Sequence, residues 1–138
     1  MNRDMDAVLG HRSWIVINLS TLKNNLNVYN ASIPSNLQIM AVVKADAYGH
    51  GDKLVAKYLS DYEINHFAVS NIDEAIHIRE AGAKGQILIL GYTPVERAGD
   101  LEKYDITQAL LSEDYAEKLA SQRVPINVSL LLILGCGV

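Results

Sequence analysis

The chain has 138 residues, which favours a single domain, and 49% of them are hydrophobic, enough for a packed core. Its 12 basic and 16 acidic residues give a net charge of −4, so the basic surface that nucleic-acid binding requires is not expected. The lone cysteine, Cys136, excludes a disulfide within the chain and has no neighbouring histidine, so no metal site is predicted. The polar start is unlike a signal peptide and no apolar run is long enough to span a membrane, so we expect a cytoplasmic chain without membrane contact.

The first part of the chain predicts a strand, a helix and a second strand. Residues 13–18 have the apolar, β-branched composition of a strand. A helix capped by Ser20 follows and ends at Pro34. Residues 38–44 form a continuous apolar run that ends in Lys44, which is typical of a strand buried on both faces. A loop over residues 46–51 follows this run.

Helices and strands then alternate to the end of the chain. Helices are predicted at residues 52–60, 72–81, 96–103 and 113–122, and strands at residues 66–69, 86–90, 106–110 and 126–134. Asn71 or Ser70 is the expected cap of the second of these helices and Gly82 its stop, and Ser112 caps the last. This alternation indicates repeated βα units and a parallel sheet.

A parallel βα chain can close as a doubly wound open sheet or as a (β/α)₈ barrel. Five strands are predicted from Gln38 onward, and the chain ends inside the fifth without a helix to cover it. A complete barrel needs eight strands in about 250 residues. We therefore predict an α/β fold: the N-terminal portion of a TIM-type (β/α)₈ barrel, truncated after about four to five βα units.

The segment Ala41–Gly51 (Ala-Val-Val-Lys-Ala-Asp-Ala-Tyr-Gly-His-Gly) carries the clearest chemical signal. Lys44 ends a buried strand, at the edge of the sheet where parallel α/β proteins place their chemistry, and apolar neighbours favour the neutral amine that attacks an aldehyde. Tyr48 adds an uncharged hydroxyl, and Gly49 and Gly51 let the chain approach a phosphate closely. Lys44 by itself is equally compatible with a solvated strand end, but the whole string indicates a lysine joined to the aldehyde of pyridoxal phosphate (PLP).

This segment resembles the PLP-lysine motif of the alanine racemase family, in which a lysine ends the first barrel strand. Four further segments are also similar to the family: Arg12–Asn18, Ile87–Gly91, Tyr92–Pro94 and Ile106–Gln108. Within the family, the chain is most similar to the serine/alanine racemases of glycopeptide-resistance operons. In those proteins a membrane domain precedes the racemase domain, so the full-length protein could be membrane-anchored.

The resemblance implies a PLP-dependent racemase that interconverts the L and D forms of alanine, serine or both. Lys44 would be the catalytic residue, as the Schiff-base lysine and one of two proton-transfer bases. Tyr48 would contact the phosphate side of the cofactor, and Val42 and Leu90 would line its pocket, although plain core positions are the alternative for these two. In the family the second base is a tyrosine from the C-terminal domain of the partner subunit. We therefore expect a homo-oligomer, and expect this chain alone to be incomplete and inactive.

Two other functions remain open. A non-enzymatic PLP-binding barrel shares the architecture, but usually lacks the Tyr-Gly-His-Gly run. A half-barrel without activity would associate with itself, because it exposes unpaired strand edges and an apolar inner face. Within the lysine loop, Asp46 and His50 are expected to order the backbone and are weaker site candidates than Tyr48.

Three segments are expected along the chain: a polar leader (1–12), the partial PLP-binding barrel (13–128) and an anomalous tail (129–138). The family carries Asp-Thr-Gly-Met at the end of its fifth strand, where this chain reads Leu-Ile-Leu-Gly-Cys-Gly. Codons exist for these residues that give Asp-Thr-Gly-Met-Arg in a shifted frame. We therefore hypothesise a frame shift in the tail, which the gene sequence would test.

Overall fold

A computed structural model describes residues 15–130, which form a five-stranded sheet with helices between its strands. The strands are β1 (Ala41–Val42), β2 (His66–Val69), β3 (Gln86–Ile89), β4 (Thr107–Leu110) and β5 (Asn127–Leu130). They lie side by side in chain order, and every neighbouring pair is parallel. The predicted parallel βα architecture is therefore confirmed.

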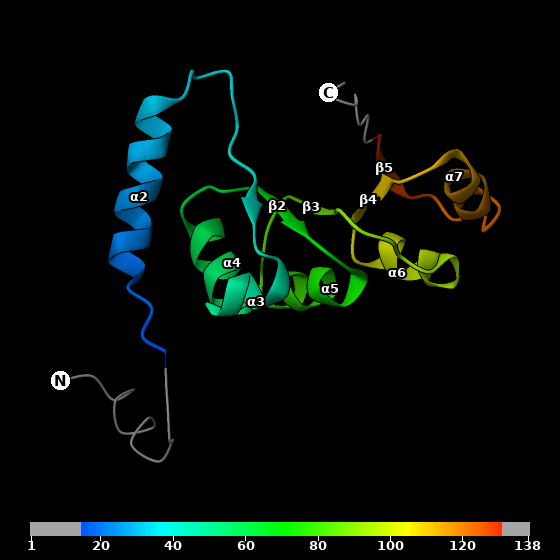
Figure 1. The fold of residues 1–138 in the computed structure, drawn as a ribbon, viewed down its shortest axis with the longest axis horizontal. Helices are drawn as coiled ribbons and strands as arrows, with labels where there is room; N and C mark the ends of the chain where they lie inside the picture. Colours follow the sequence, from blue (N-terminus) through cyan, green and yellow to red (C-terminus); the bar gives the residue numbers. More distant parts are fainter. Residues whose placement is uncertain (1–14, 131–138) are drawn as a thin grey trace, which may run out of the picture.

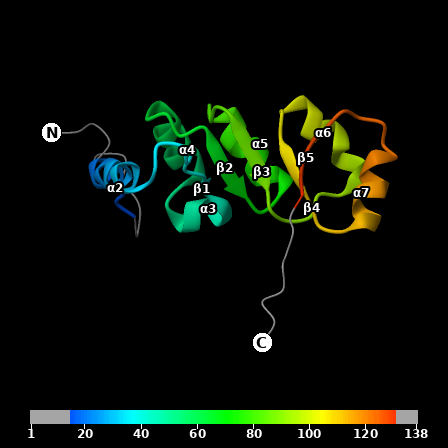
Figure 2. The same ribbon diagram turned by 90° about the horizontal axis from the view of Figure 1, so that it is seen from above.

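A helix follows each of the first four strands, as a parallel connection requires. These helices are α4 (Asp52–Asp61), α5 (Ile72–Glu80), α6 (Ala98–Lys103), which continues a 3₁₀ turn (Val95–Arg97), and α7 (Glu113–Ala120). They follow the strands around the sheet in chain order (Figures 1 and 2). Helix α2 (Leu19–Ser32) precedes the sheet and is joined to β1 by an extended segment (Figure 1). It packs on the first βα unit, where Leu26 is buried and Lys23 Nζ lies 4.5 Å from the centre of the Tyr62 ring.

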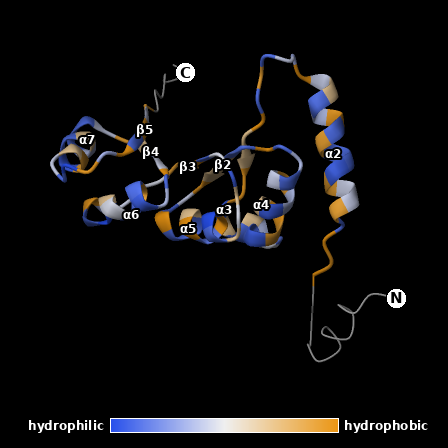
Figure 3. Ribbon diagram, turned by 180° about the vertical axis from the view of Figure 1, so that it is seen from behind, coloured by the Kyte–Doolittle hydropathy of each residue, from blue (hydrophilic) through white to orange (hydrophobic). Residues whose placement is uncertain are grey.

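The core lies between the strands and helices α4 to α7, and Leu26 of α2 also belongs to it. Because side chains alternate along a strand, Phe67 and Val69 of β2 share a face with Ile87 and Ile89 of β3, and all four are fully buried. The helices contribute the buried residues Val55, Leu59, Ile72, Ile78, Leu101 and Leu119. Hydrophilic and hydrophobic residues alternate along the helices (Figure 3), as in helices that bury one face.

Most predicted helix ends are confirmed. The Asn71 side chain accepts a hydrogen bond from the Glu74 backbone at the start of α5, and Ser112 accepts one from the Tyr115 backbone at the start of α7. After α5, Gly82 adopts a φ of 100°, the left-handed conformation that glycine tolerates best. Local capping chemistry therefore set these boundaries as the sequence predicted.

The start of the chain differs from the prediction. The expected strand over residues 13–18 is wrong over its described part, because Ile15–Asn18 has no strand structure, while Ser13 and Trp14 lie outside the described residues. Asn18, and not Ser20, caps α2 by accepting a hydrogen bond from the Thr21 backbone at 3.0 Å. A β-prone composition makes a strand only where a neighbouring strand supplies hydrogen-bond partners.

Strand β1 is shorter than the predicted run over residues 38–44. Its two residues pair Ala41 with Phe67 and Val42 with Ala68, and the ladder continues with the Val43 N–H donating to the Ala68 carbonyl at 2.9 Å. Because β2 begins at His66, which is level with Met40, the residues that precede Met40 run past the start of their neighbour. The predicted last strand, residues 126–134, is observed as β5 up to Leu130, and its remainder lies outside the described residues.

Arg79 ties the end of α5 to the turn that leads into β4. Its guanidinium donates hydrogen bonds to the backbone carbonyls of Ala83, Tyr104 and Asp105 at 3.0, 2.9 and 2.7 Å. Burial lowers the pKa of Arg79, and the Asp105 charge partly opposes this. One side chain thus satisfies carbonyl groups from two connections of the barrel.

Gly85, just before β3, packs closely against the backbone of Asn65. Its φ is 72°, and a Cβ there would lie 2.3 Å from the backbone oxygen of Asn65. We expect Gly85→Ala to destabilise the fold by about 2 kcal/mol or more, because neither backbone can give way easily. The control is Gly99→Ala in α6, where a Cβ meets nothing within 4 Å; it should be neutral or stabilise by about 0.5 kcal/mol. Urea unfolding measures both, and equal midpoints for the two variants would contradict the packing described.

Candidate active site

Lys44 and Leu90 lie at the carboxyl edge of the sheet, after β1 and β3 respectively. Val42 of β1 is opposite Ala68, and Ala68 is opposite Leu88 of β3. Val42 and Leu88 therefore share a face, and Leu90, whose N–H continues the ladder by donating to the Val69 carbonyl at 2.9 Å, lies on it too. Lys44 follows the end of β1, where Val43 (φ −121°, ψ 23°) leaves the extended conformation. One strand separates β1 from β3, roughly 10 Å at two strand spacings. The register therefore brings Val42 and Leu90 to one face of the sheet, with Lys44 at the carboxyl end of β1.

Tyr48 is the fourth predicted site residue, and it is the most open of the four. Its side chain is 60% exposed and that of Val42 is 43% exposed, while Lys44 and Leu90 are half-buried. Val42 borders a groove of about 580 Å³ between the unpaired edge of β1 and the start of α2.

The segment after Lys44 is not the irregular loop that the sequence predicted. It forms a turn of left-handed helix, α3 (Lys44–Gly49), in which Ala45, Asp46, Ala47 and Tyr48 have φ between 50° and 56°. A non-glycine residue in this conformation costs about 1–2 kcal/mol. Four in succession are therefore a strained backbone that other contacts must hold in place.

Hydrogen bonds inside and behind the turn supply some of these contacts. The Ala47 N–H donates to the Val43 carbonyl at 3.0 Å, and His50 Nδ1 lies 2.8 Å from the Ala47 carbonyl. The Asp46 carboxylate accepts a hydrogen bond from the Asp52 backbone at 2.9 Å, at the start of α4. Asp46 and His50 thus order the lysine loop, as the sequence predicted.

Glu74 holds the first residue of the same turn, Ala45, and the sequence did not predict this role for Glu74. One carboxylate oxygen accepts a hydrogen bond from the Ala45 N–H at 2.8 Å. The other accepts from the Ser70 N–H at 2.8 Å and from its hydroxyl at 2.7 Å. The spacing Asn71-x-x-Glu74 was a usable signal, since it matches a capping box. In a capping box the glutamate returns to its own helix start, whereas here one oxygen does so through Ser70 and the other reaches the residue after Lys44.

The electrostatics of Glu74 follow from these contacts. Burial would raise the pKa of its carboxyl, but the hydrogen bonds from Ser70 and Ala45 and the positive charge of Lys44 together hold it below its ordinary value of 4.5. The folded structure therefore favours the ionised form of the Glu74 carboxyl.

A pH dependence of stability follows. Because folding lowers the pKa of Glu74, its ionised form contributes stability above pH 4.5, and this contribution is lost as the pH falls through the folded-state pKa. We expect Glu74→Gln to be less stable than the wild type at neutral pH, and the difference to shrink as the pH falls below 4.5. Urea unfolding at a series of pH values measures this. A difference that stays constant throughout would contradict the assignment.

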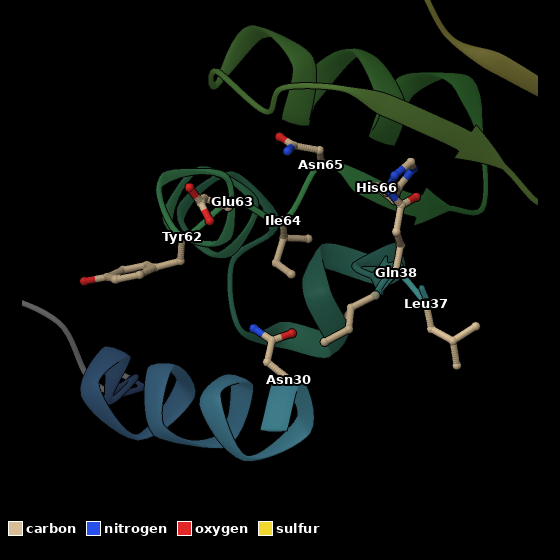
Figure 4. A pocket seen from close by; sticks show the side chains of 9 residues that line it. Asn30, Leu37, Gln38, Tyr62, Glu63, Ile64, Asn65 and His66 are labelled. Carbon is tan, nitrogen blue, oxygen red and sulfur yellow. The ribbon is translucent and has the colours of Figure 1, made fainter. Parts of the chain in front are cut away.

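A second cleft lies at the opposite end of the sheet (Figure 4). It has a volume of about 240 Å³ and lies between Asn30 of α2 and the segment Tyr62–His66 that enters β2. Parallel α/β barrels place chemistry at the carboxyl edge and use the amino edge for stability. This cleft is therefore not the candidate site.

Within residues 15–130, no group of three or more histidine, cysteine, aspartate or glutamate side chains is arranged to hold a metal ion. Over the same part of the chain, no helix combines the length and hydropathy of a bilayer-crossing segment.

Comparison with known proteins places these features in a family. The model of the alanine racemase N-terminal domain matches residues 17–137. An amino-acid racemase of Enterococcus faecalis is 41% identical over 119 residues, and a serine/alanine racemase of Enterococcus gallinarum is 41% identical over 116. These matches cover 86% and 84% of this chain but only 17% of each relative.

A solved structure carries the same arrangement. The alanine racemase of Clostridium difficile 630, in complex with cycloserine, superposes with a TM-score of 0.75 at 38% identity, covering 81% of this chain and 32% of that one. The open parallel sheet thus corresponds to the first part of a barrel, as predicted. By sequence and by fold, the chain belongs to the alanine racemase family.

Proposed function

We propose that this chain supplies the lysine side of the active site of a PLP-dependent amino-acid racemase acting on alanine, serine or both. The observation that carries the proposal is the position of Lys44, half-buried at the carboxyl end of β1 and followed by a strained left-handed turn. Strain of this kind gathers at functional sites, where the surrounding structure maintains it. Membership of a family whose named members racemise amino acids supports the same assignment.

The residues present fit PLP. Lys44 offers an amine at the sheet edge, and Val42 and Leu90 offer apolar surface on the same face. The exposed hydroxyl of Tyr48, four residues on, is free to reach a phosphate oxygen. When bound, PLP stabilises the negative charge left on the α-carbon of an amino acid by loss of its proton.

Lys44 would hold PLP through its Nζ atom, and the same amine, when free, would accept the α-proton on one face or return a proton to it. Val42 and Leu90 would line the pocket with apolar surface, and Tyr48 would contact the phosphate side. Inversion also requires a base on the opposite face. We propose that a partner subunit supplies it, so that the active form is a homo-oligomer and the separate chain is inactive.

The test is covalent capture of PLP. The chain is mixed with PLP, reduced with borohydride, digested and analysed by peptide mass spectrometry. An adduct confined to Lys44 supports the proposal, whereas labelling spread over exposed lysines such as Lys53 and Lys57 contradicts it. Exchange of the α-hydrogen of alanine or serine in deuterated water, measured on a portion of the PLP mixture kept unreduced, separates catalysis from simple PLP binding.

A further inference from the structure

The Glu74 carboxylate joins three segments that are distant in sequence. It belongs to the first turn of α5, accepts both donors of Ser70 at the end of β2, and accepts the N–H of Ala45 directly after Lys44. The Ala45 contact bridges 29 residues of sequence. It therefore fixes the lysine-bearing segment against the neighbouring βα unit, and not merely against itself.

The contact between Glu74 and Ala45 lies where the backbone changes from the strand to the left-handed turn. Val43 still donates into the sheet ladder, whereas Ala45 is the first residue of the left-handed turn, with a φ of 52°. Lys44 lies between the two. An anchor on the Ala45 N–H therefore determines the direction in which the chain leaves the sheet, and with it the position of the Lys44 side chain.

We propose that Glu74 is a positioning residue for Lys44, holding the left-handed turn in the conformation that directs the Lys44 amine across the carboxyl edge of the sheet. The inference rests on the proposed function of Lys44. It assigns Glu74 no contact with substrate or cofactor, and Glu74 acts through the Ala45 backbone.

A carboxylate of this length suits the task. Its two oxygens face three donors, two N–H groups and one hydroxyl. In Glu74→Gln, one oxygen would become an NH₂ group that meets another donor. In Glu74→Asp the charge remains, but the side chain is one methylene shorter and cannot reach Ser70 and Ala45 together. These two variants separate charge from position.

Asp73 provides a matched control from the same helical turn. Its carboxylate lies 2.6 Å from Arg97 Nη1. Asp73→Asn removes the same charge from the first turn of α5, with the same effect on the helix dipole. It leaves the Ala45 contact untouched.

The experiment needs no cofactor. Amide hydrogen exchange at Ala45 is measured in the wild type and in Glu74→Gln, Glu74→Asp and Asp73→Asn. The acylation rate of Lys44 by acetic anhydride is measured relative to Lys53 in the same samples. We expect Ala45 exchange to rise at least about tenfold in both Glu74 variants and to stay unchanged in Asp73→Asn.

Acylation adds a readout that a purely structural role would not produce. A purely structural role of Glu74 would leave the ratio of Lys44 to Lys53 acylation unchanged in the folded chain. If Glu74 positions Lys44, both Glu74 variants should change this ratio by about two- to fivefold, and Asp73→Asn should not. Unchanged Ala45 exchange in both folded Glu74 variants, or identical effects from Asp73→Asn, would overturn the inference.

PLP capture on the same samples distinguishes this inference from the proposed function. If Ala45 exchange responds to Glu74 but the wild type forms no adduct at Lys44, the positioning contact stands and the proposed function fails. If the wild type forms the adduct and Glu74→Asp forms it as fast, with Ala45 exchange unchanged, the proposed function stands and the inference fails.

Discussion

Lys44→Arg is expected to abolish the reducible PLP adduct completely while the fold remains intact. Arginine keeps the positive charge and nearly the length of lysine, but its delocalised guanidinium remains protonated and does not condense with an aldehyde. Because Lys44 is half-buried at the edge of the sheet, the change should disturb the core little. In an assembled racemase, loss of this base should lower turnover by at least about a hundredfold. Peptide mass spectrometry after reduction measures the adduct.

Lys53→Arg is the control for this experiment. Lys53 is an exposed lysine in the first turn of α4, nine residues after Lys44, and it tests labelling that depends on amine exposure alone. It should retain the full Lys44 adduct. If instead Lys44→Arg keeps the adduct level of the wild type, the cofactor is held elsewhere and the assignment of Lys44 is wrong.

The fold was predictable where local signals agreed with tertiary contacts. The apolar runs around Phe67 and Ile87 are buried strands, and the caps at Asn71 and Ser112 open the predicted helices. Prediction failed at Ile15–Asn18, whose composition favours a strand but which has no strand structure. Strand formation depends on a partner, and one-dimensional patterns do not record whether a partner is near.

The sequence predicted the lysine of the candidate site, but not the residue and the turn that hold this lysine in place. Lys44 and Tyr48 belong to one short, distinctive string, so the sequence alone singles them out. Glu74 lies on another βα unit, and its role depends on how the end of β2 packs against the lysine turn. The left-handed turn was also missed, because Ala45 to Tyr48 includes no glycine and left-handed conformations are rarely expected of such residues.

Phe67→Ala is expected to have the largest effect on stability, about 3–5 kcal/mol. Phe67 is fully buried in the second strand of the sheet, opposite Ala41 of β1 and Ile87 of β3. Removing its ring opens a cavity between the sheet and the helices that cover it, and a core of this density refills such a cavity only in part. Since a domain is typically stable by only about 5–15 kcal/mol, the variant should be close to unfolding. Urea unfolding, followed by circular dichroism, gives the change.

Leu54→Ala distinguishes this cavity effect from the mere loss of an apolar side chain. Leu54 is 51% exposed on α4, so its truncation should change stability by no more than about 0.5 kcal/mol. The site adds a second readout, because β2 holds β1 and β3 in register and so fixes Lys44 relative to Leu90. Phe67→Ala should therefore weaken PLP capture at Lys44 under conditions in which most molecules are still folded, and Leu54→Ala should not. If Phe67→Ala loses stability but captures PLP as fast as the wild type, the lysine turn is held by its own contacts and those of Glu74, independently of the sheet register.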